Sequence, residues 1–229
     1  MNILGLQLQT TDLDGQVAFY RDFLQLPLVE ERPDFIAFQA GKTKLVFAAA
    51  EMDTNPTYYF AFGVPEAQLA DIEQRARNAR VTITHAHDSV FLDGNQRGLY
   101  VQDKGGNLVG FVTFPRPPEA VTLSNGMNIY GVAEVGLAVQ TLDEALEQLT
   151  RRLGTEVHAI TGSGAIAGDS NGVFRLARQW ESWFPGLAFR AEIAPLSVTV
   201  EGMELSATRL GDLPYYIQIA NLSQSAAPL

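Results

Sequence analysis

Five residues combine a chemically useful side chain with a position from which it could reach a bound molecule: Gln7, Tyr59, Arg97, Glu134 and Trp183. Gln7, Tyr59 and Glu134 each lie in a run of alternating residue types, which is typical of strands with two different faces. The residues that share a face with Tyr59 and Glu134 are glycines and alanines, which leave room for a guest. Small-molecule sites are commonly concave and mostly apolar, with a few orienting polar groups. The sequence therefore makes Gln7, Tyr59 and Glu134 candidates for binding a small molecule.

Arg97 and Trp183 are predicted to complete this site from loops. Arg97 lies in the segment GNQRGLY and is a candidate for binding an anionic group. Trp183 belongs to RQWESWFPG, whose aromatic residues would either wall a pocket or seal an interface. Each candidate also has a structural interpretation, as a solvated amide, a core-edge aromatic ring or a half-exposed carboxylate. No catalytic residue is assigned.

Other chemistries find little support in the sequence. The chain has no cysteine, which excludes disulfides, thiolate metal sites and cysteine nucleophiles. His85 and His87, with Asp88 and Asp93 nearby, lack a clear third ligand and are more typical of a surface strand. The glycine-rich segment 162–168 has neither the strand–turn–helix context of a nucleophile elbow nor a following helix that would suit a dinucleotide.

Composition narrows the class of protein. Of the 229 residues 46% are hydrophobic and 18% charged, which is typical of a globular chain. The net charge of −10 disfavours binding to nucleic acid and to anionic membranes. The N-terminus lacks the features of a signal peptide, and no apolar run is long enough to cross a membrane. We expect a cytoplasmic protein whose partner is a small molecule.

The elements that would position these residues come from an internal repeat. When Leu8 is aligned with Leu137, Asp14 falls on Asp143, and a strand followed by an amphipathic helix occurs in both copies. The pattern predicts four strand–helix–strand–strand–strand units, the last one truncated because no helix follows its first strand at residues 196–200. A segment with three prolines, 115–120, is predicted to link a first half, 1–114, to a degenerate second half, 121–222, which is followed by a tail, 223–229.

This pattern resembles the vicinal oxygen chelate superfamily, which includes glyoxalase I, extradiol dioxygenases and bleomycin-resistance proteins. The resemblance is carried by TTDLDGQVAFYRDFLQLPLV, YYFAFGVPE and YVQDKGGNLVGFV in the first half, and by QTLDEALEQLTRRLG in the second. It implies an α+β fold in which paired βαβββ modules form cupped mixed sheets, arranged as two tandem halves. If the family's ligand positions face the cup here too, strand alternation places Gln7, Tyr59 and Glu134 on its lining.

The resemblance also implies where a metal would bind, as the family usually supplies two histidines and a glutamate from strands that line the cup. Here the three positions in the first half fall on Gly5, Tyr59 and Gly110. Neither glycine nor a neutral phenol is a normal ligand for a divalent metal. We therefore expect no metal and no other cofactor. Glu134 occupies the equivalent position of the third unit and could ligate, but its expected partner segments, near residues 195–196 and 218–221, offer neither histidine nor acid.

Three functions follow from this reading. The first is a superfamily member without the usual metal ligands that binds a small apolar or aromatic molecule in the cupped sheet. The alternative is a metal-dependent lyase or extradiol-type dioxygenase with a relocated site, which would use Fe, Mn, Ni or Zn at Glu134 and perhaps His85 or His87. The third is a structural or partner-binding protein whose cup is closed by its own side chains. The sheet edges left by the truncated unit make a homodimer plausible.

Overall fold

The computed structural model describes residues 1–51, 53–84, 98–113, 121–122, 128–160, 164–184, 186–202 and 206–221. The first unit contains β1 (Ile3–Thr10), α1 (Leu13–Val17) with a π-helical extension (Ala18–Phe23), β2 (Leu28–Arg32), β3 (Phe35–Ala40) and β4 (Thr43–Ala49). The second contains β5 (Tyr59–Val64), a 3₁₀ turn (Glu66–Gln68), α2 (Leu69–Asn78), β6 (Ile83–Thr84), β7 (Gly98–Gln102) and β8 (Leu108–Thr113).

A short ribbon of β9 (Val121–Thr122) and β10 (Asn128–Ile129) leads into the third unit, which contains β11 (Gly131–Val139), α3 (Leu142–Leu153), β12 (Glu156–Ile160), β13 (Gly164–Asp169) and β14 (Gly172–Arg178). The fourth unit has β15 (Leu196–Glu201), β16 (Ser206–Arg209) and β17 (Tyr215–Ala220). Among its described residues there is no helix between β15 and β16, so the predicted truncation is confirmed. The linker 115–120 and the tail 223–229 lie outside the described residues.

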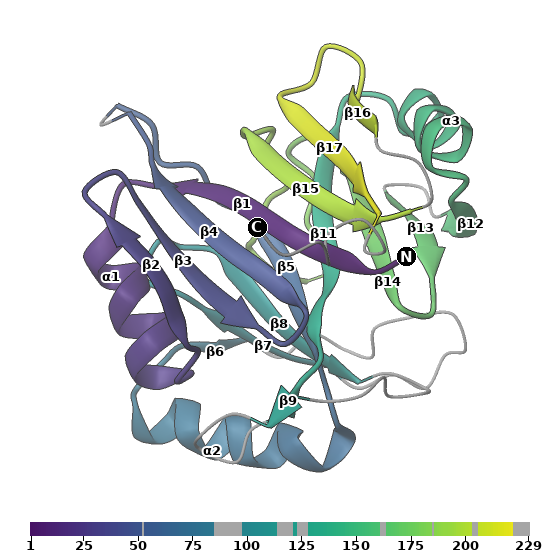
Figure 1. Cartoon of the computed structure of the whole chain (residues 1–229). Helices are drawn as coiled ribbons and strands as arrows, with labels where there is room; N and C mark the ends of the chain where they lie inside the picture. Colours follow the sequence, from purple (N-terminus) through teal and green to yellow (C-terminus); the bar gives the residue numbers. More distant parts are fainter. Residues whose placement is uncertain are drawn as a thin grey trace.

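The four units pair across the two halves of the chain. One sheet has seven strands in the order β16-β17-β15-β1-β4-β3-β2, and the other has eight in the order β12-β13-β14-β11-β5-β8-β7-β6. The first unit thus pairs with the fourth through β1 and β15, and the second pairs with the third through β5 and β11, each time antiparallel. In Figure 1 the seven-stranded sheet lies in front of β5, β7 and β8, with α1, α2 and α3 at the periphery. The predicted α+β fold with cupped mixed sheets is confirmed.

A continuous hydrophobic core fills the space between the two sheets. Leu6 and Leu8 enter it from the seven-stranded sheet, and Phe60 and Phe62 enter it from the eight-stranded sheet. The predicted alternation is therefore correct on β1 and β5, because these strands have a period of two residues.

Strand β2 was not predicted, since it is a charged edge strand whose Val29 is 50% exposed and which lacks an apolar face.

Tyr20 joins α1's extension to both sheets. Its ring centroid lies 4.9 Å from that of Phe47 in the seven-stranded sheet and 6.4 Å from that of Phe60 in the eight-stranded sheet. Its hydroxyl donates a 2.8 Å hydrogen bond to Asp103, the first residue of the turn between β7 and β8. Burial raises the pKa of the Asp103 carboxyl, although hydrogen bonds from Asn107, Tyr20 and Gly105 favour its charged form. The turn with the sequence DKGGN, residues 103–107, is thus anchored to the core through Tyr20.

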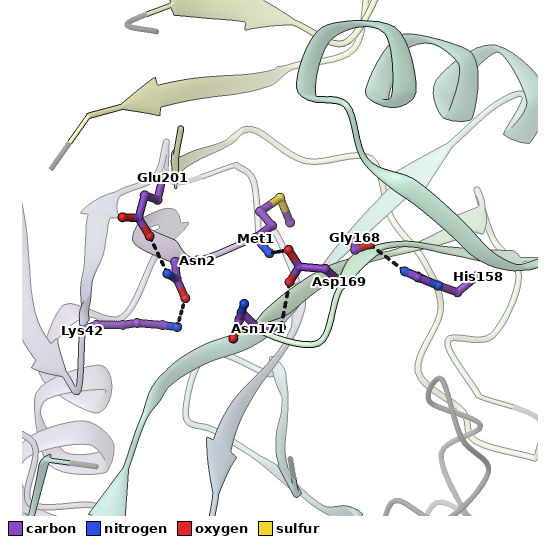
Figure 2. A network of polar contacts seen from close by, with 8 residues as sticks. All are labelled: Met1, Asn2, Lys42, His158, Gly168, Asp169, Asn171 and Glu201. Carbon is purple, nitrogen blue, oxygen red and sulfur yellow. Dashed lines mark hydrogen bonds and ion pairs between the residues drawn. The ribbon is translucent and has the colours of Figure 1, made fainter. Parts of the chain in front are cut away.

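A polar network joins the sheets where β1 begins (Figure 2). Asn2 contacts both Lys42, before β4, and Glu201, at the end of β15. Asp169, the last residue of β13, pairs with the Met1 ammonium group and accepts a 2.7 Å hydrogen bond from the Asn171 amide. The two residues before β1 are therefore tied to strand ends in both sheets. No helix in the described part of the chain is long and apolar enough to span a membrane.

We predict that Tyr20→Phe lowers the free energy of unfolding by about 2 kcal/mol, because a buried carboxyl loses a hydrogen-bond donor. Urea denaturation would measure the change. Tyr216→Phe is the matched control, since the Tyr216 side chain is exposed and its hydroxyl remains in water. An equal effect of the two substitutions would contradict a role for the Tyr20–Asp103 hydrogen bond.

Candidate functional site

The cup of the eight-stranded sheet contains a buried ion pair on a floor of small residues. Glu134 on β11 has a side chain 0% exposed, and its Oε2 atom lies 3.1 Å from Nε of Arg175 on the neighbouring strand β14. The hydroxyl of Tyr59, on β5, donates to the same oxygen. Strand pairing places these residues together, because Glu134 lies beside Ala61 on one side and Val173 on the other. The pair neutralises a carboxylate that would be costly to bury alone.

Burial and nearby charges determine the protonation states of Tyr59 and Arg175. Burial, followed by the charge of Glu134, raises the pKa of the Tyr59 hydroxyl well above its usual value, so this group remains a donor. Burial lowers the pKa of Arg175, but the charges of Glu134, Tyr59 and Tyr100 and the hydrogen bond to Glu134 together outweigh that effect, so the net pKa is raised. Both side chains therefore keep these states throughout the physiological pH range. The other carboxylate oxygen of Glu134, Oε1, is buried and accepts no hydrogen bond from the described residues.

The connection between β14 and β15 covers the cup. We call residues 179–184 and 186–195 the plug segment. Trp183 and Phe184 reach from it into the cup, where they are only 7% and 5% exposed. The Trp183 ring lies 5.5 Å from the Tyr59 ring, centroid to centroid, and the Phe184 ring lies 4.7 Å from the Arg175 guanidinium carbon. A cation stacked on an aromatic face is stabilised by the ring's quadrupole.

The floor beneath these rings is made of glycine and alanine. A Cβ atom on Gly136 would lie 2.8 Å from the Trp183 ring, and one on Gly110 would lie 2.8 Å from the Cβ atom of Ala61. The plug segment can approach β11 closely only because Gly136 has no side chain. The predicted space above small residues therefore exists, and the protein's own aromatic rings fill it.

The plug segment is held mainly by hydrogen bonds within itself. The Trp180 amide donates to Ala191 O, the Ala191 amide donates to Glu181 O, and the Trp183 amide donates to Phe189 O. Trp180 has a left-handed backbone, with φ at 70°, and its side chain is 61% exposed. Bulky residues seldom adopt this conformation. It places the two tryptophans on opposite sides of the segment, one in solvent and one in the cup.

The structure thus brings together three of the five predicted residues: Tyr59, Glu134 and Trp183. Gln7 lies instead on the exposed face of the seven-stranded sheet, because β1 pairs with β15 rather than with the second unit. The expectation that Gly5, Tyr59 and Gly110 share one site is wrong for the same reason. Glu134 likewise faces β5 and β14, and not the segments near 195 and 218. Arg97, His85, His87, Asp88 and Asp93 lie outside the described residues.

Two residues of this site were missed at the sequence level. Arg175 is the one charged residue within the otherwise apolar run GVFRLA, and a charge in the middle of such a strand was a usable signal. Phe184 was noted only as part of an aromatic segment. Its contact with Arg175 depends on a loop conformation that no periodicity encodes.

No protein-family model and no curated protein sequence matches the chain. Among solved structures, a "putative dioxygenase" from Bacillus subtilis superposes over 96% of this chain and 85% of its own, with a TM-score of 0.71 and 16% identity. The chain has the vicinal oxygen chelate fold. Glyoxalase I from Zea mays superposes over 98% of this chain and 93% of a solved mutant form, with a TM-score of 0.60 and 13% identity. Identities this low establish the fold alone.

The metal that this fold often carries does not fit beside Glu134. The Arg175 guanidinium already occupies one side of the carboxylate and would repel a divalent cation. A side chain at Gly110, the position expected for the family's glutamate, would collide with Ala61 and Tyr100. Within the described ranges no group of three or more His, Asp or Glu residues could hold a metal ion. The lost metal site stays a prediction, since His85 and His87 lie outside those ranges.

We predict that Glu134→Gln lowers the free energy of unfolding by about 3 kcal/mol, because it leaves the Arg175 charge buried without its partner. Chemical denaturation would measure this loss. Glu144→Gln changes an exposed glutamate of α3 and should shift stability by less than about 0.5 kcal/mol. If the two variants are equally stable, the buried pair does not hold the cup together.

Proposed function

We propose that this protein binds a small aromatic molecule, without a metal, in the cup of the eight-stranded sheet. The observation that carries the proposal is the Oε1 atom of Glu134, a buried acceptor without a hydrogen-bond donor among the described residues. Buried polar atoms are nearly always paired, so an orphan of this kind points to a missing partner. A ligand N–H or O–H group would supply it.

The surroundings of Glu134 favour a planar aromatic ligand. Gly136 and Ala138 provide a floor for a flat ring in the space that the Trp183 ring now fills, and the Tyr59 ring borders that space. Aromatic side chains make favourable stacked or edge contacts with a bound ring. A ligand would enter by displacing Trp183 and Phe184, and the internal hydrogen bonds of the plug segment allow it to move as a unit.

The packing of Trp183 and Phe184 also supports a second function, in which the closed cup is purely structural. Both rings belong to a buried cluster with Tyr59, Tyr100 and Ala191. In that case the plug segment is a permanent part of the core, and the protein acts through its surface. Ligand-induced stabilisation separates the two functions.

We predict that an aromatic molecule with a donor group raises the melting temperature and changes the emission of Trp183. The probes are benzamidine, catechol and quinoline. The background is Trp180→Phe, which leaves Trp183 as the chain's remaining tryptophan. A true ligand at 100 times its Kd should add about 2.7 kcal/mol of stability.

The matched control for binding is Glu134→Gln, which weakens the acceptor while preserving the shape of the side chain. This variant should lose the ligand-induced shift. If no probe changes either stability or emission, the structural function is favoured. If probes stabilise the protein equally in Glu134→Gln, the ligand lies elsewhere.

Elemental analysis of untagged protein, before and after incubation with Fe(II), Mn(II), Ni(II) and Zn(II), tests the absence of a metal. We expect less than one equivalent of bound metal per chain, because Arg175 neutralises Glu134. A stoichiometric metal would instead favour the lyase or dioxygenase alternative and would direct attention to His85 and His87.

A further inference from the structure

The concave face of the seven-stranded sheet carries a row of polar side chains that the filled cup does not use. The register places Gln7 opposite Ser197, Ser197 beside Tyr216, and Tyr216 opposite Arg209. Directly paired residues point to the same face of a sheet. These four side chains, from β1, β15, β17 and β16, therefore form one line across the strands, which we call the cross-strand row. Each of them is exposed or half-buried.

The cross-strand row lines a hollow of about 450 Å³. Other parts of its wall come from the turn before β17, with Asp212 and Pro214, and from Pro195, which precedes β15. The Tyr58 hydroxyl fixes this wall, because it donates a 2.8 Å hydrogen bond to Pro195 O and accepts one of 3.2 Å from the Gln9 amide. Burial raises the pKa of Tyr58 to about 12, so the hydroxyl remains protonated. The volume lies within the range of small-molecule pockets.

The chemistry of the lining is neutral and rich in both donors and acceptors. The Gln7 amide and the Ser197 hydroxyl can each donate and accept a hydrogen bond. Arg209 supplies donors and Asp212 supplies acceptors, and their opposite charges leave the hollow without a net charge. Tyr216, 40% exposed, offers a ring face against which C–H groups can pack.

We propose that this hollow is a second binding site, for a neutral polyhydroxylated molecule such as a mono- or disaccharide. A sugar presents hydroxyl groups that both donate and accept, and it presents a C–H face that packs on an aromatic ring. A phosphate or carboxylate would require a net positive lining, and an apolar ligand would leave the amide and hydroxyl groups without partners. The neighbouring Thr199 and Gln218, paired in register two residues along, extend the polar surface by about 7 Å.

This site is independent of the proposed function. The cross-strand row lies on the other sheet, and the hydrophobic core separates it from Glu134. The plug segment contributes only Pro195 to the hollow, and the Tyr58 hydroxyl holds that residue by a hydrogen bond to its carbonyl oxygen. Failure of one proposal therefore does not affect the other.

The test is a titration of isotopically labelled full-length protein with glucose and with maltose, followed by ¹H–¹⁵N NMR. We expect saturable shifts of backbone amides in β1, β15 and β17. Tyr216→Ala and Gln7→Ala should each weaken binding about tenfold, which corresponds to about 1.4 kcal/mol. Both residues are exposed, so these variants should fold normally. Tyr216→Phe should retain most of the affinity because it keeps the ring.

The matched control is Gln74→Ala, which removes an exposed amide from α2 and should leave sugar binding unchanged. The proposal is overturned if neither sugar produces saturable shifts. It is also overturned if the shifts survive in Tyr216→Ala and Gln7→Ala, because the sugar then binds elsewhere. Saturation by benzoate in place of the sugars would identify an anion site at Arg209 and would equally reject the proposal.

Discussion

The burial of Glu134 is the constraint on which the interior of the eight-stranded sheet depends. A carboxylate without solvent exposure needs a counter-charge at contact distance, and Arg175 provides it from the adjacent strand. Phe184 lies over the Arg175 guanidinium group, which stabilises the cation and strengthens its attraction to Glu134 by lowering the local dielectric. The plug segment is thus held in the cup by electrostatics as well as by the hydrophobic contacts of its aromatic rings.

The two concave faces of the molecule have opposite characters although they are built from the same repeated unit. The cup of the eight-stranded sheet is buried, has an ion pair at its centre and is covered by aromatic rings. The face of the seven-stranded sheet is open, and amides and hydroxyl groups line it. The difference follows from sequence length as much as from residue type, since the connection between β14 and β15 is long enough to fold back over its own sheet.

Much of the fold follows from local patterns in the sequence. The helix Leu142–Leu153 follows from its strong amphipathic period, and the hairpin of β3 and β4 is marked by its Gly41 turn. The strand period also placed Tyr59 and Glu134 on the face of the cup. Pairing between units is different, because it depends on contacts between distant residues that no local pattern encodes. This is why Gln7 was assigned to the same cup as Tyr59 and Glu134, whereas the local signal of Arg175, a charge within an apolar strand, was overlooked.

The exchange of units between the halves has a consequence for how the chain folds. The eight-stranded sheet uses only the second and third units, which are neighbours in sequence, so it can form as soon as both have left the ribosome. The seven-stranded sheet joins the first strand of the chain to β15 and must wait for the last unit. Until then β1 has an unpaired edge, which is the state in which nascent chains are most prone to associate wrongly. The seven-stranded sheet, in which the two ends of the chain meet, is therefore complete only when the last unit has been made.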